Sequence, residues 1–423
     1  MTVLAAMPEY ESYKDSGIDW LGEVPDHWQI RRFKFLTSIT TGGKNTEDKE
    51  DGGEYPFFVR SQIPEKINTY SYDGEAILTA GDGAGVGKVY HYVNGKFDYH
   101  QRVYKFSDFT KVSGQYLYRY LYVNFYNVAI LGTAKSTVDS LRLPLIQDFN
   151  ICFPEGKEEQ SRIIQYLDKK TTQIDEAIAI KQKQIELLKE RKQIIIQKAV
   201  TQGLDPNVPM RDSGHKWLGS IPKHWKLLRV KQIFNLVMQP AEKNNNHELL
   251  SVYTDIGVKP RKELEERGNK ASTTDGYWLV KKGDIIVNKL LAWMGAIGLS
   301  NYDGVTSPAY DVLRSTRPIE GMFYHLLFRS DFCSEELKKH SRGIMDMRLR
   351  LYFDRFGVVE VPYPPVEEQT KIIAHIEQLF LKIDRAIEHQ QAQIQNLKEY
   401  KTTLINSAVT GKIKVPNICK LKG

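Results

Sequence analysis

Hydrophobic residues recur at helical spacing in two long and otherwise polar segments of the chain. The first segment has its apolar seam at Leu167, Ile174, Ile178, Ile185 and Leu188. The second has the same intervals at Ile376, Ile383, Ile387, Ile394 and Leu397. Steps of seven, four and three residues keep these side chains on one face of a helix, and neither segment contains Pro or Gly. The pattern therefore predicts two long amphipathic helices, each with a heptad seam.

The two helical segments are copies of one another. Residues 158–201 match residues 367–410 at a constant offset of 209, without a gap. Some forty residues rising ~1.5 Å each would form a rod of ~60 Å. Because both copies share one register, we expect them to pair with each other in an antiparallel arrangement within the chain. Dimerisation of two chains through a coiled coil is the alternative.

A short motif is also repeated, once before each variable stretch. Asp15–Trp28 returns at 212–225 with nine of fourteen positions identical. Its tryptophans are predicted to be structural, with two of them packing on helix ends to join each globular part to a rod; the four are Trp20, Trp28, Trp217 and Trp225. The repeated His27 and His224 lie in Pro-x-His-Trp turns and are expected to pack beside the tryptophan that follows.

Between the motifs and the helices lie two stretches rich in Tyr, Phe, Val and Gly. Short strand-like runs, such as 75–78, 88–93 and 284–287, alternate with Gly, Asn and Asp turns. The predicted fold class is α+β: two mixed α/β globular domains separated by two long antiparallel coiled-coil helices, with a pseudo-twofold internal duplication. The two stretches resemble each other only weakly, for example at Leu141-Arg142-Leu143 and Leu349-Arg350-Leu351. We therefore expect a shared scaffold with diverged surfaces.

The repeats set the predicted domain boundaries. They are an N-terminal segment at 1–28, a first globular domain at 29–157, a central helical region at 158–203, a linker with the repeated motif at 204–225, a second globular domain at 226–366, a distal helical region at 367–411 and a basic tail at 412–423. At 423 residues the chain is long enough for each globular domain to bury a core of its own.

Composition narrows the class of protein. Hydrophobic residues make up 41% and charged residues 26% of the chain, and the net charge of +7 permits a polyanionic partner without requiring one. No apolar run approaches the ~18 residues of a membrane span, and the first residues do not resemble a signal peptide, so we expect a cytoplasmic protein. Cys152, Cys333 and Cys419 are far apart and lack CxxC spacing, which predicts reduced thiols and neither disulfides nor a zinc site.

Catalytic motifs are not found in the sequence. The Gly-rich run Gly81–Lys88 lacks the first glycine and the Ser or Thr of a nucleotide-binding P-loop, so it is interpreted as a hairpin near DNA backbone or as a structural turn. There is no Asn-Pro-Pro-aromatic loop of an adenine methyltransferase, and Pro364-Pro365 introduces the second long helix instead. We expect no catalysis by this chain alone.

The repeated Asp-Ser-Gly-x-x-Trp-Leu-Gly-x-x-Pro-x-His-Trp motif, together with Pro-Pro-Val-Glu-Glu-Gln-Thr-Lys-Ile-Ile at 364–373, resembles the specificity subunit of type I restriction–modification enzymes. The resemblance covers nearly the whole chain. It implies that each globular insert is a target recognition domain and that the chain binds double-stranded DNA without catalysing a reaction. Residues 153–157 depart from the family pattern, because the first copy lacks the Pro-Pro pair.

The same resemblance implies the partners. Two methyltransferase subunits would flip and methylate one adenine in each half-site, and two restriction or translocase subunits would join where the host has them. S-adenosylmethionine, ATP and magnesium are expected on those partner subunits, and no cofactor or metal on this chain. The polar outward positions of the long helices are the expected docking surface.

Two different recognition domains held apart by a rod predict a bipartite, asymmetric DNA target. A rod of ~60 Å at ~3.4 Å per base pair limits the distance between half-site centres to about 17 base pairs. Candidate DNA-contacting residues need donors that reach phosphates or guanine edges. In the first domain they are Arg60, Gln101, Arg102, Lys135 and Arg142, and in the second they are Lys289, Arg342, Arg348 and Arg350.

Two rival interpretations remain open at this point. One is a stand-alone DNA methyltransferase or nuclease with its own catalytic site. The other is a coiled-coil DNA-binding scaffold without a modification partner. Activity of the purified chain would favour the first, and co-purification with a methyltransferase polypeptide would exclude the second.

Overall fold

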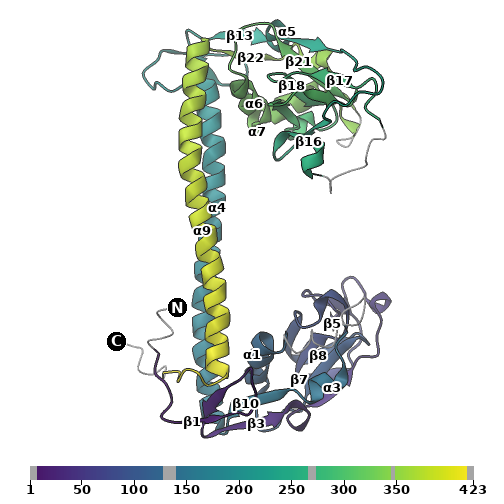
Figure 1. Cartoon of the computed structure of the whole chain (residues 1–423), viewed down its shortest axis with the longest axis vertical. Coiled ribbons are helices and arrows are strands. Elements are labelled where there is room, and N and C mark those ends of the chain that lie inside the picture. Colours follow the sequence, from purple (N-terminus) through teal and green to yellow (C-terminus); the bar gives the residue numbers. More distant parts are fainter. Residues whose placement is uncertain (1–6, 127–139, 265–272, 344–347, 417–423) are drawn as a thin grey trace. The chain divides into compact units, whose positions relative to one another are not determined.

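A computed structural model describes residues 7–126, 140–264, 273–343 and 348–416. The chain forms two compact units. Unit 1 contains residues 1–182 and 391–423, and unit 2 contains residues 183–390. Each unit combines one globular module with a segment of each long helix (Figure 1). The division therefore falls within the two helices, rather than at their ends as the predicted domain boundaries have it.

Unit 1 is built on a six-stranded sheet with the order β4-β9-β7-β8-β5-β6, antiparallel except for the β5–β8 pair. The sheet consists of β4 (Ser38–Thr41), β5 (Tyr55–Phe58), β6 (Glu65–Ile67), β7 (Tyr72–Ala80), β8 (Tyr90–Tyr99) and β9 (Val103–Ser107). The hairpin of β1 (Tyr13–Asp15) and β2 (Glu23–Pro25), the pair of β3 (Trp28–Arg32) and β10 (Asn150–Pro154), and the helices α1 (Gly114–Asn124) and α3 (Leu143–Gln147) complete the module.

Unit 2 repeats this order of elements around a smaller sheet, β14-β21-β18-β19. Its strands are β14 (Phe234–Val237), β18 (Ile285–Asn288), β19 (Ile297–Leu299) and β21 (Tyr310–Ser315). Three antiparallel pairs accompany it: β11 (Met210–Asp212) with β12 (Ser220–Pro222), β15 (Leu250–Tyr253) with β16 (Gly257–Pro260), and β17 (Trp278–Val280) with β20 (Gly304–Thr306). The pair of β13 (Lys226–Arg229) and β22 (Glu360–Tyr363) closes the module, whose helices are α5 (Val230–Ile233), α6 (Gly321–Arg329), α7 (Asp331–His340) and α8 (Phe353–Phe356).

The repeated motif forms the same hairpin in both units. The amide of Ser16 donates to the carbonyl of Gly22 at 3.0 Å, and the amide of Ser213 donates to that of Gly219 at the same distance. Both glycines have positive φ, near +62° and +65°, where a side chain would be strained. The sequence repeat is therefore a structural repeat.

The long helices are α4 (Lys157–Gln202) and α9 (Val366–Val409). Each begins one residue earlier than its predicted boundary. In unit 1 the Lys401 ammonium lies 2.7 Å from the Asp175 carboxylate, and in unit 2 the Lys192 ammonium lies 2.5 Å from that of Asp384. Within each unit, a segment of α4 therefore runs beside a segment of α9 in the opposite direction (Figure 1).

The predicted seam residues lie on the packed faces of these helices. Leu167, Ile174, Ile185, Ile376, Ile383 and Ile394 are buried, and Ile178, Leu188, Ile387 and Leu397 are partly buried. Leu167 and Ile174 belong to the same apolar cluster as side chains of the module of unit 1, and Ile376 belongs to that of unit 2. Helix pairing and module packing therefore share one core in each unit.

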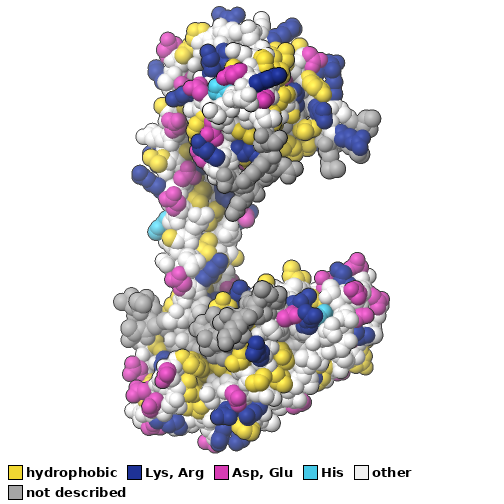
Figure 2. All heavy atoms as spheres, turned by 45° about the vertical axis from the view of Figure 1, so that its right-hand side comes forward, with side chains coloured by type: hydrophobic (Ala, Val, Ile, Leu, Met, Phe, Trp, Pro, Cys, Tyr) yellow, Lys and Arg dark blue, Asp and Glu magenta, His cyan; other side chains and the backbone are white. Residues whose placement is uncertain are grey.

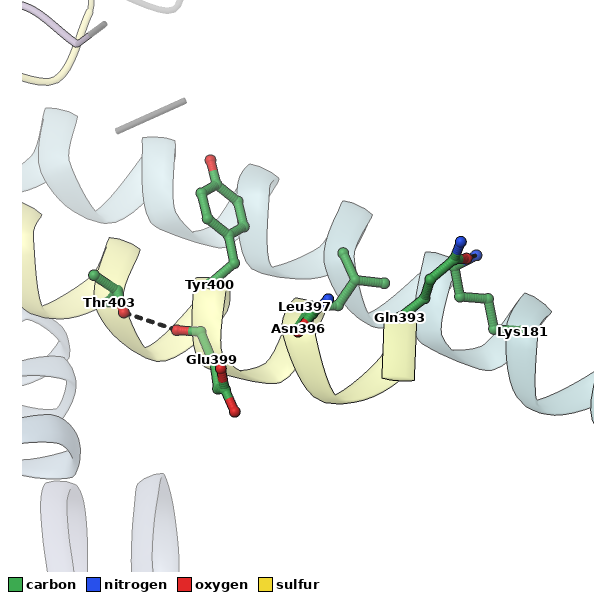
Figure 3. Close-up of a pocket in the computed structure, with 7 residues that line it drawn as sticks. All are labelled: Lys181, Gln393, Asn396, Leu397, Glu399, Tyr400 and Thr403. Carbon is green, nitrogen blue, oxygen red and sulfur yellow. Dashed lines mark hydrogen bonds between the residues drawn. The ribbon is translucent and has the colours of Figure 1, made fainter. Parts of the chain in front are cut away.

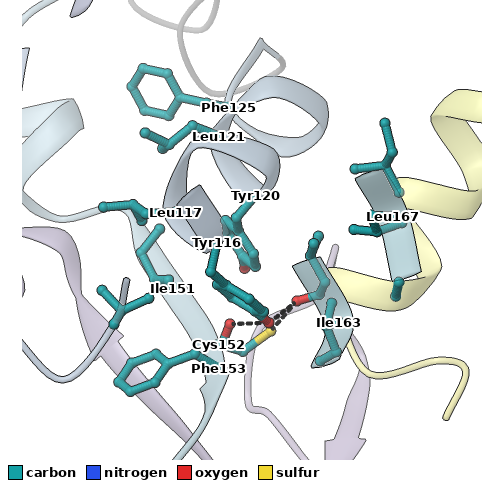
Figure 4. Close-up of a cluster of buried hydrophobic side chains, with 14 of the residues drawn as sticks. Tyr116, Leu117, Tyr120, Leu121, Phe125, Ile151, Cys152, Phe153, Ile163 and Leu167 are labelled. Carbon is teal, nitrogen blue, oxygen red and sulfur yellow. Dashed lines mark hydrogen bonds between the residues drawn. The ribbon is translucent and has the colours of Figure 1, made fainter. Parts of the chain in front are cut away.

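In unit 1 this core connects module and helix ends through polar as well as apolar contacts (Figure 4). The buried Tyr116 hydroxyl donates to the carbonyl of Val409, the last residue of α9, at 2.7 Å. The Cys152 thiol lies 3.6 Å from the same oxygen. Burial raises the pKa of Cys152 to about 12 and also raises that of Cys333, so both stay protonated thiols. Cys419 lies outside the described residues.

Candidate nucleic-acid interface

The junction between each module and its long helix uses the repeated histidine. The His27 imidazole lies 2.9 Å from the Glu159 carboxylate at the start of α4, and His224 lies 2.8 Å from Glu368 at the start of α9. His224 also packs edge-on against Trp225, as predicted for a structural histidine. The sequence did not indicate the carboxylate partner, although both glutamates lie in the repeated Glu-Glu-Gln.

The glutamine of the same Glu-Glu-Gln is the buried link of each junction. The Gln160 amide accepts from the backbone N–H of Ser113, the N-cap of α1, and donates to the carbonyls of Lys111 and Pro154, all at 2.9 Å. Gln369 accepts from the N–H of Glu320, the N-cap of α6, at 2.9 Å and donates to the Pro364 carbonyl at 2.8 Å. Each amide thus holds the start of a module helix against the start of a long helix.

The tryptophans of the repeated motif divide into two pairs. Trp28 and Trp225 are buried in the cores of their units. The prediction that Trp20 and Trp217 pack on helix ends to join each module to a long helix needs correction in part. Trp20 stacks on Phe149 at 5.7 Å, and Trp217 stacks at 5.9 Å on Phe332 in the first turn of α7, so both contacts lie within the module. Both rings project from the turn of the hairpin, which places them on the module.

Three predicted DNA-contacting residues of unit 1, Arg60, Gln101 and Arg102, come together at one end of the sheet. We call this place tip 1, and it also includes Asp82 and the turn 81–87. The Arg60 and Arg102 guanidiniums hold the two oxygens of the Asp82 carboxylate, at 2.9 and 2.6 Å. Gln101 donates to the Asn45 side chain at 2.6 Å. Both arginine side chains remain about half exposed, at 41% and 59%.

Charge balance at tip 1 is positive. Partial burial raises the pKa of Asp82, but hydrogen bonds from Arg60 and Arg102 outweigh it and hold the pKa below the usual value. Burial and Arg60 lower the pKa of the neighbouring His100, which therefore stays neutral near pH 7. One carboxylate between two guanidiniums leaves an excess of one positive charge for a partner.

Of the remaining two candidates of unit 1, Arg142 lies among the described residues. Arg142 is exposed, and the amide of the preceding Leu141 donates to the Gly81 carbonyl at 2.8 Å, so this segment lies beside tip 1. Lys135 lies outside the described residues.

The four candidates of unit 2 gather at the corresponding place, which we call tip 2: Lys289, Arg342, Arg348 and Arg350 with the turn 289–295. The carbonyl of Lys289 accepts from the amide of Leu351, and Arg342 and Arg350 exchange two backbone hydrogen bonds of 2.9 Å. The Lys289 ammonium donates to the Pro308 carbonyl at 2.9 Å and pairs with Asp311 at 3.3 Å. Its side chain is only 19% exposed, so of the four it is the least available to DNA.

The rest of tip 2 is open to solvent. Arg342 pairs with Asp354 at 2.8 Å, but both side chains are more than half exposed, and Arg348 and Arg350 are exposed as well. Leu290, Leu291 and Met294 of the turn also present apolar side chains, at 39%, 40% and 52% exposure. Tip 2 thus combines exposed guanidiniums with exposed apolar groups.

Exposed cationic and amide donors at two loop clusters are suited to contact phosphates and base edges. Figure 2 shows Lys and Arg scattered among acidic and hydrophobic side chains on the visible face of each unit. Within the described part of the chain, no group of three or more His, Cys, Asp or Glu is placed to bind a metal. No helix among the described residues is long and apolar enough to cross a membrane.

A groove of about 660 Å³ lies on the helix pair of unit 1 (Figure 3). Lys181 of α4 and residues of α9 line it: Gln393, Asn396, Leu397, Glu399, Tyr400 and Thr403. Lys181 donates to the Gln393 amide, and Thr403 to the Glu399 carbonyl within its own helix. The lining holds one carboxylate and no histidine or cysteine, so it offers a surface for contact and not a set of catalytic groups.

Sequence reasoning missed the acidic partners of both tips. Asp82 stands where a nucleotide-binding P-loop has its first glycine, and Asp311 and Asp354 belong to no motif. Each lies 12 to 22 residues from the cation it pairs with, a separation at which no local pattern links the two.

Comparison with known proteins gives a consistent picture. The family described as type I restriction modification DNA specificity domain matches the chain twice, at residues 25–190 and 222–396. The EcoDI specificity subunit of a type I restriction enzyme from Escherichia coli is 24% identical over 403 residues, 89% of this chain and 87% of that protein. The MjaVIII specificity subunit from Methanocaldococcus jannaschii is 23% identical and covers 93% and 95% of the two chains.

Solved structures share the fold at low identity. A chain from a study of complex assembly and conformational transition in a type I restriction–modification system has a TM-score of 0.63 at 13% identity, covering 91% of this chain and 98% of that one. The HsdS subunit from Thermoanaerobacter tengcongensis has a TM-score of 0.51 at 14% identity, with 92% and 98% covered. The two matched copies make up most of the chain and each contains one module, so this chain belongs to the family of type I restriction–modification specificity subunits, with two target recognition domains.

Proposed function

We propose that each recognition module reads one half of a bipartite, asymmetric DNA target. The observation that carries this proposal is the pair of tips: both lie on the turn that follows an equivalent sheet strand, β7 or β18, and both expose guanidinium groups. Their side chains differ in kind, with an arginine–aspartate cluster at tip 1 and apolar groups beside arginines at tip 2. Equivalent positions with different chemistry fit two half-sites of different sequence.

The long helices are proposed to set the distance between the half-sites. Each helix begins in one unit and ends in the other, and within each unit the α4 and α9 segments pack in opposite directions. An antiparallel pair of copied helices relates the two modules by a pseudo-twofold axis. The length of the helices then fixes the unspecified spacer of the target.

Catalysis is proposed to reside on partner subunits. Two methyltransferase subunits would bind this chain, flip one adenine in each half-site and methylate it with S-adenosylmethionine, and two ATP- and magnesium-dependent restriction or translocase subunits would join where present. The groove of Figure 3, with Leu397 and Tyr400 among polar side chains, supports docking of a helical partner on the long helices.

A comparison of genomic N6-methyladenine with and without the gene tests the proposal most broadly. We expect methylation at one bipartite motif that disappears on deletion and returns when the gene is restored. Unchanged methylation, in a host that expresses the chain with its methyltransferase, would contradict the function. Cleavage or methylation by the purified chain alone would instead favour a stand-alone enzyme.

The spacer role is tested by removing one heptad from both helices. Seven residues correspond to about 10 Å, or about three base pairs. We expect a spacer about three base pairs shorter, with both half-sites unchanged. Altered half-sites with an unchanged spacer would show that the helices do not set the distance.

A further inference from the structure

The Gly-rich turn of tip 1 serves an arrangement that the proposed function alone does not explain. Asp82 lies in this turn between Arg60 and Arg102, which come from two other parts of the module. The two guanidiniums repel each other across one carboxylate, and at 41% and 59% exposure of the arginine side chains solvent screens much of the attraction in these pairs. A role in stability is therefore a weak reason for the cluster.

The glycines of the turn allow it to lie directly against the two arginines. A Cβ on Gly85 would sit 2.6 Å from the Arg60 carbonyl, and a Cβ on Gly81 would sit 2.9 Å from that of Arg102. The Gly81 amide donates to the same Arg102 carbonyl at 2.8 Å. Any other residue at these two positions would push the turn away, and Asp82 with it.

Asp82 is also held from the other side. It forms an antiparallel β-bridge with Ser140, and the Leu141 amide donates to the Gly81 carbonyl. The Asp82 side chain is only 15% exposed. The carboxylate is thus fixed by backbone contacts, and it fixes the two more mobile guanidiniums in turn.

We infer that Asp82 is a positioning residue that holds Arg60 and Arg102 ready for guanine edges in the half-site of the first module, an inference that rests on the proposed function. Arginine binds guanine through O6 and N7 with a planar pair of donors, so fixing its orientation in advance lowers the cost of binding. The hollow beside the cluster is lined by Arg60, Ser61, Asp82 and the turn, and by Glu65, which pairs with Lys49 at 3.7 Å.

A phosphate is the less suitable occupant of this hollow. Contact with a phosphate needs positive charge and little orientation, and a fixed carboxylate within 3 Å of both arginines opposes it. A base edge tolerates the carboxylate, because the amino group of a neighbouring cytosine can donate to it.

The test uses the full chain in complex with its methyltransferase subunit and duplexes that carry 7-deazaguanine in one half-site at a time. This base keeps its pairing but lacks N7. We expect roughly tenfold weaker binding when guanine in the first half-site is replaced, and a smaller loss for the Arg102→Ala complex, which keeps only Arg60. Asp82→Asn should reduce the sensitivity to 7-deazaguanine, and Asp82→Glu should restore part of it.

Two further variants separate positioning from general effects. Gly85→Ala keeps every charge and should act like Asp82→Asn, because it displaces the turn. Asp354→Asn removes the exposed carboxylate that pairs with Arg342 in tip 2 and should leave the first half-site unaffected.

Three outcomes would overturn the inference alone, while the wild-type complex still prefers its target. The first is a first half-site without guanine, and the second is the same 7-deazaguanine effect in the wild-type and Arg102→Ala complexes. The third is that Asp82→Asn weakens the binding of target and scrambled duplexes equally and reduces the salt dependence of binding, because that result indicates a phosphate contact. A wild-type complex that does not distinguish target from scrambled DNA contradicts the proposed function itself, and this inference with it.

Discussion

The junctions of the two modules are built from the same kinds of contact, whereas the two tips are not. Both junctions pair a repeated histidine with a glutamate and bury a glutamine that binds the N-cap of a module helix. At the tips, Asp82 holds two arginines in unit 1, while in unit 2 Lys289 and Arg342 each have a carboxylate of their own, beside exposed Leu290, Leu291 and Met294.

This difference reflects what a substitution costs at each place. A buried amide that loses its partners costs about 1–3 kcal/mol per group, whereas most exposed substitutions change stability by less than about 0.5 kcal/mol. After a duplication, stability therefore restricts substitutions at the junctions, whereas the exposed tips are free to diverge.

The largest expected effect tests whether the two junctions are equivalent. Trp28 and Trp225 are 1% and 2% exposed, so Trp28→Ala and Trp225→Ala should each cost about 3–5 kcal/mol of unfolding free energy. Chemical denaturation of the full chain measures both, with Trp20→Ala as a control at a 46% exposed site. A cost below about 1 kcal/mol for one of the two buried sites would show that the junctions differ.

The glutamines provide the next test. Gln160→Met and Gln369→Met remove buried hydrogen bonds while keeping apolar volume, and each should cost about 2–4 kcal/mol. Gln160 makes three such bonds and Gln369 makes two, so the loss should be larger in unit 1. Gln173→Met on the exposed face of α4 is the matched control. Equal stability of the Gln160 variant and this control would contradict the role of the buried glutamine in stabilising the junction.

A pH dependence sharpens the comparison between the module helices. His325 lies five residues after the N-cap of α6, where α1 has Tyr118. Its ring accepts from the Leu299 amide at 3.0 Å, and burial together with Arg329 lowers its pKa to about 4. Between pH 6.5 and 4 the unfolded chain binds a proton that folded unit 2 does not. The free energy of unfolding should therefore decrease by up to about 3 kcal/mol as the pH is lowered through this range.

The variant His325→Gln isolates this contribution. Glutamine keeps an acceptor but does not titrate, so the decline in the stability of unit 2 between pH 6.5 and 4 should become shallower. Burial also lowers the pKa of His91 and His100 in unit 1, so the comparison is made between wild type and variant within unit 2. Identical slopes for the two proteins would contradict the assignment.

The smallest expected effect comes from the exposed ion pairs of the junctions. The His27 and His224 side chains are 52% and 45% exposed, so His27→Ala and His224→Ala should each cost less than about 1 kcal/mol. Thermal denaturation of both variants at pH 6 gives the comparison. A loss of several kcal/mol in either would mean that the histidine, and not the buried glutamine, holds the junction.

The repeats and the helices were predictable because their signals are local and periodic. A heptad seam such as that from Leu167 to Leu188 places its side chains on one face whatever the rest of the chain does. The presence of two domains with mixed helix and strand content followed from the order of the repeats. The predicted role of Trp20 and Trp217 in joining each module to a long helix needed correction, because the sequence does not say toward which side a hairpin turn projects.

The sequence predicted individual candidate residues of the tips, but it did not predict how they cluster. Arg60, Gln101 and Arg102 were candidates for their donors alone. That they share one carboxylate depends on how close a glycine turn can approach two carbonyls, a distance that no sequence pattern records. In the sequence, Asp82 was noticeable only because it replaces the first glycine of a P-loop. That substitution excludes a nucleotide-binding loop but does not indicate that Asp82 binds two arginines.

The most direct test of the central claim is to replace module 2, residues 226–366, with a second copy of module 1, residues 29–157, and to map the methylated target. If the proposed pseudo-twofold axis relates the modules, two identical modules should read a palindrome made of the first half-site and its inverted repeat, with the spacer close to its original length. A folded, methylation-competent complex that keeps the original asymmetric target would contradict the claim that each module reads one half-site.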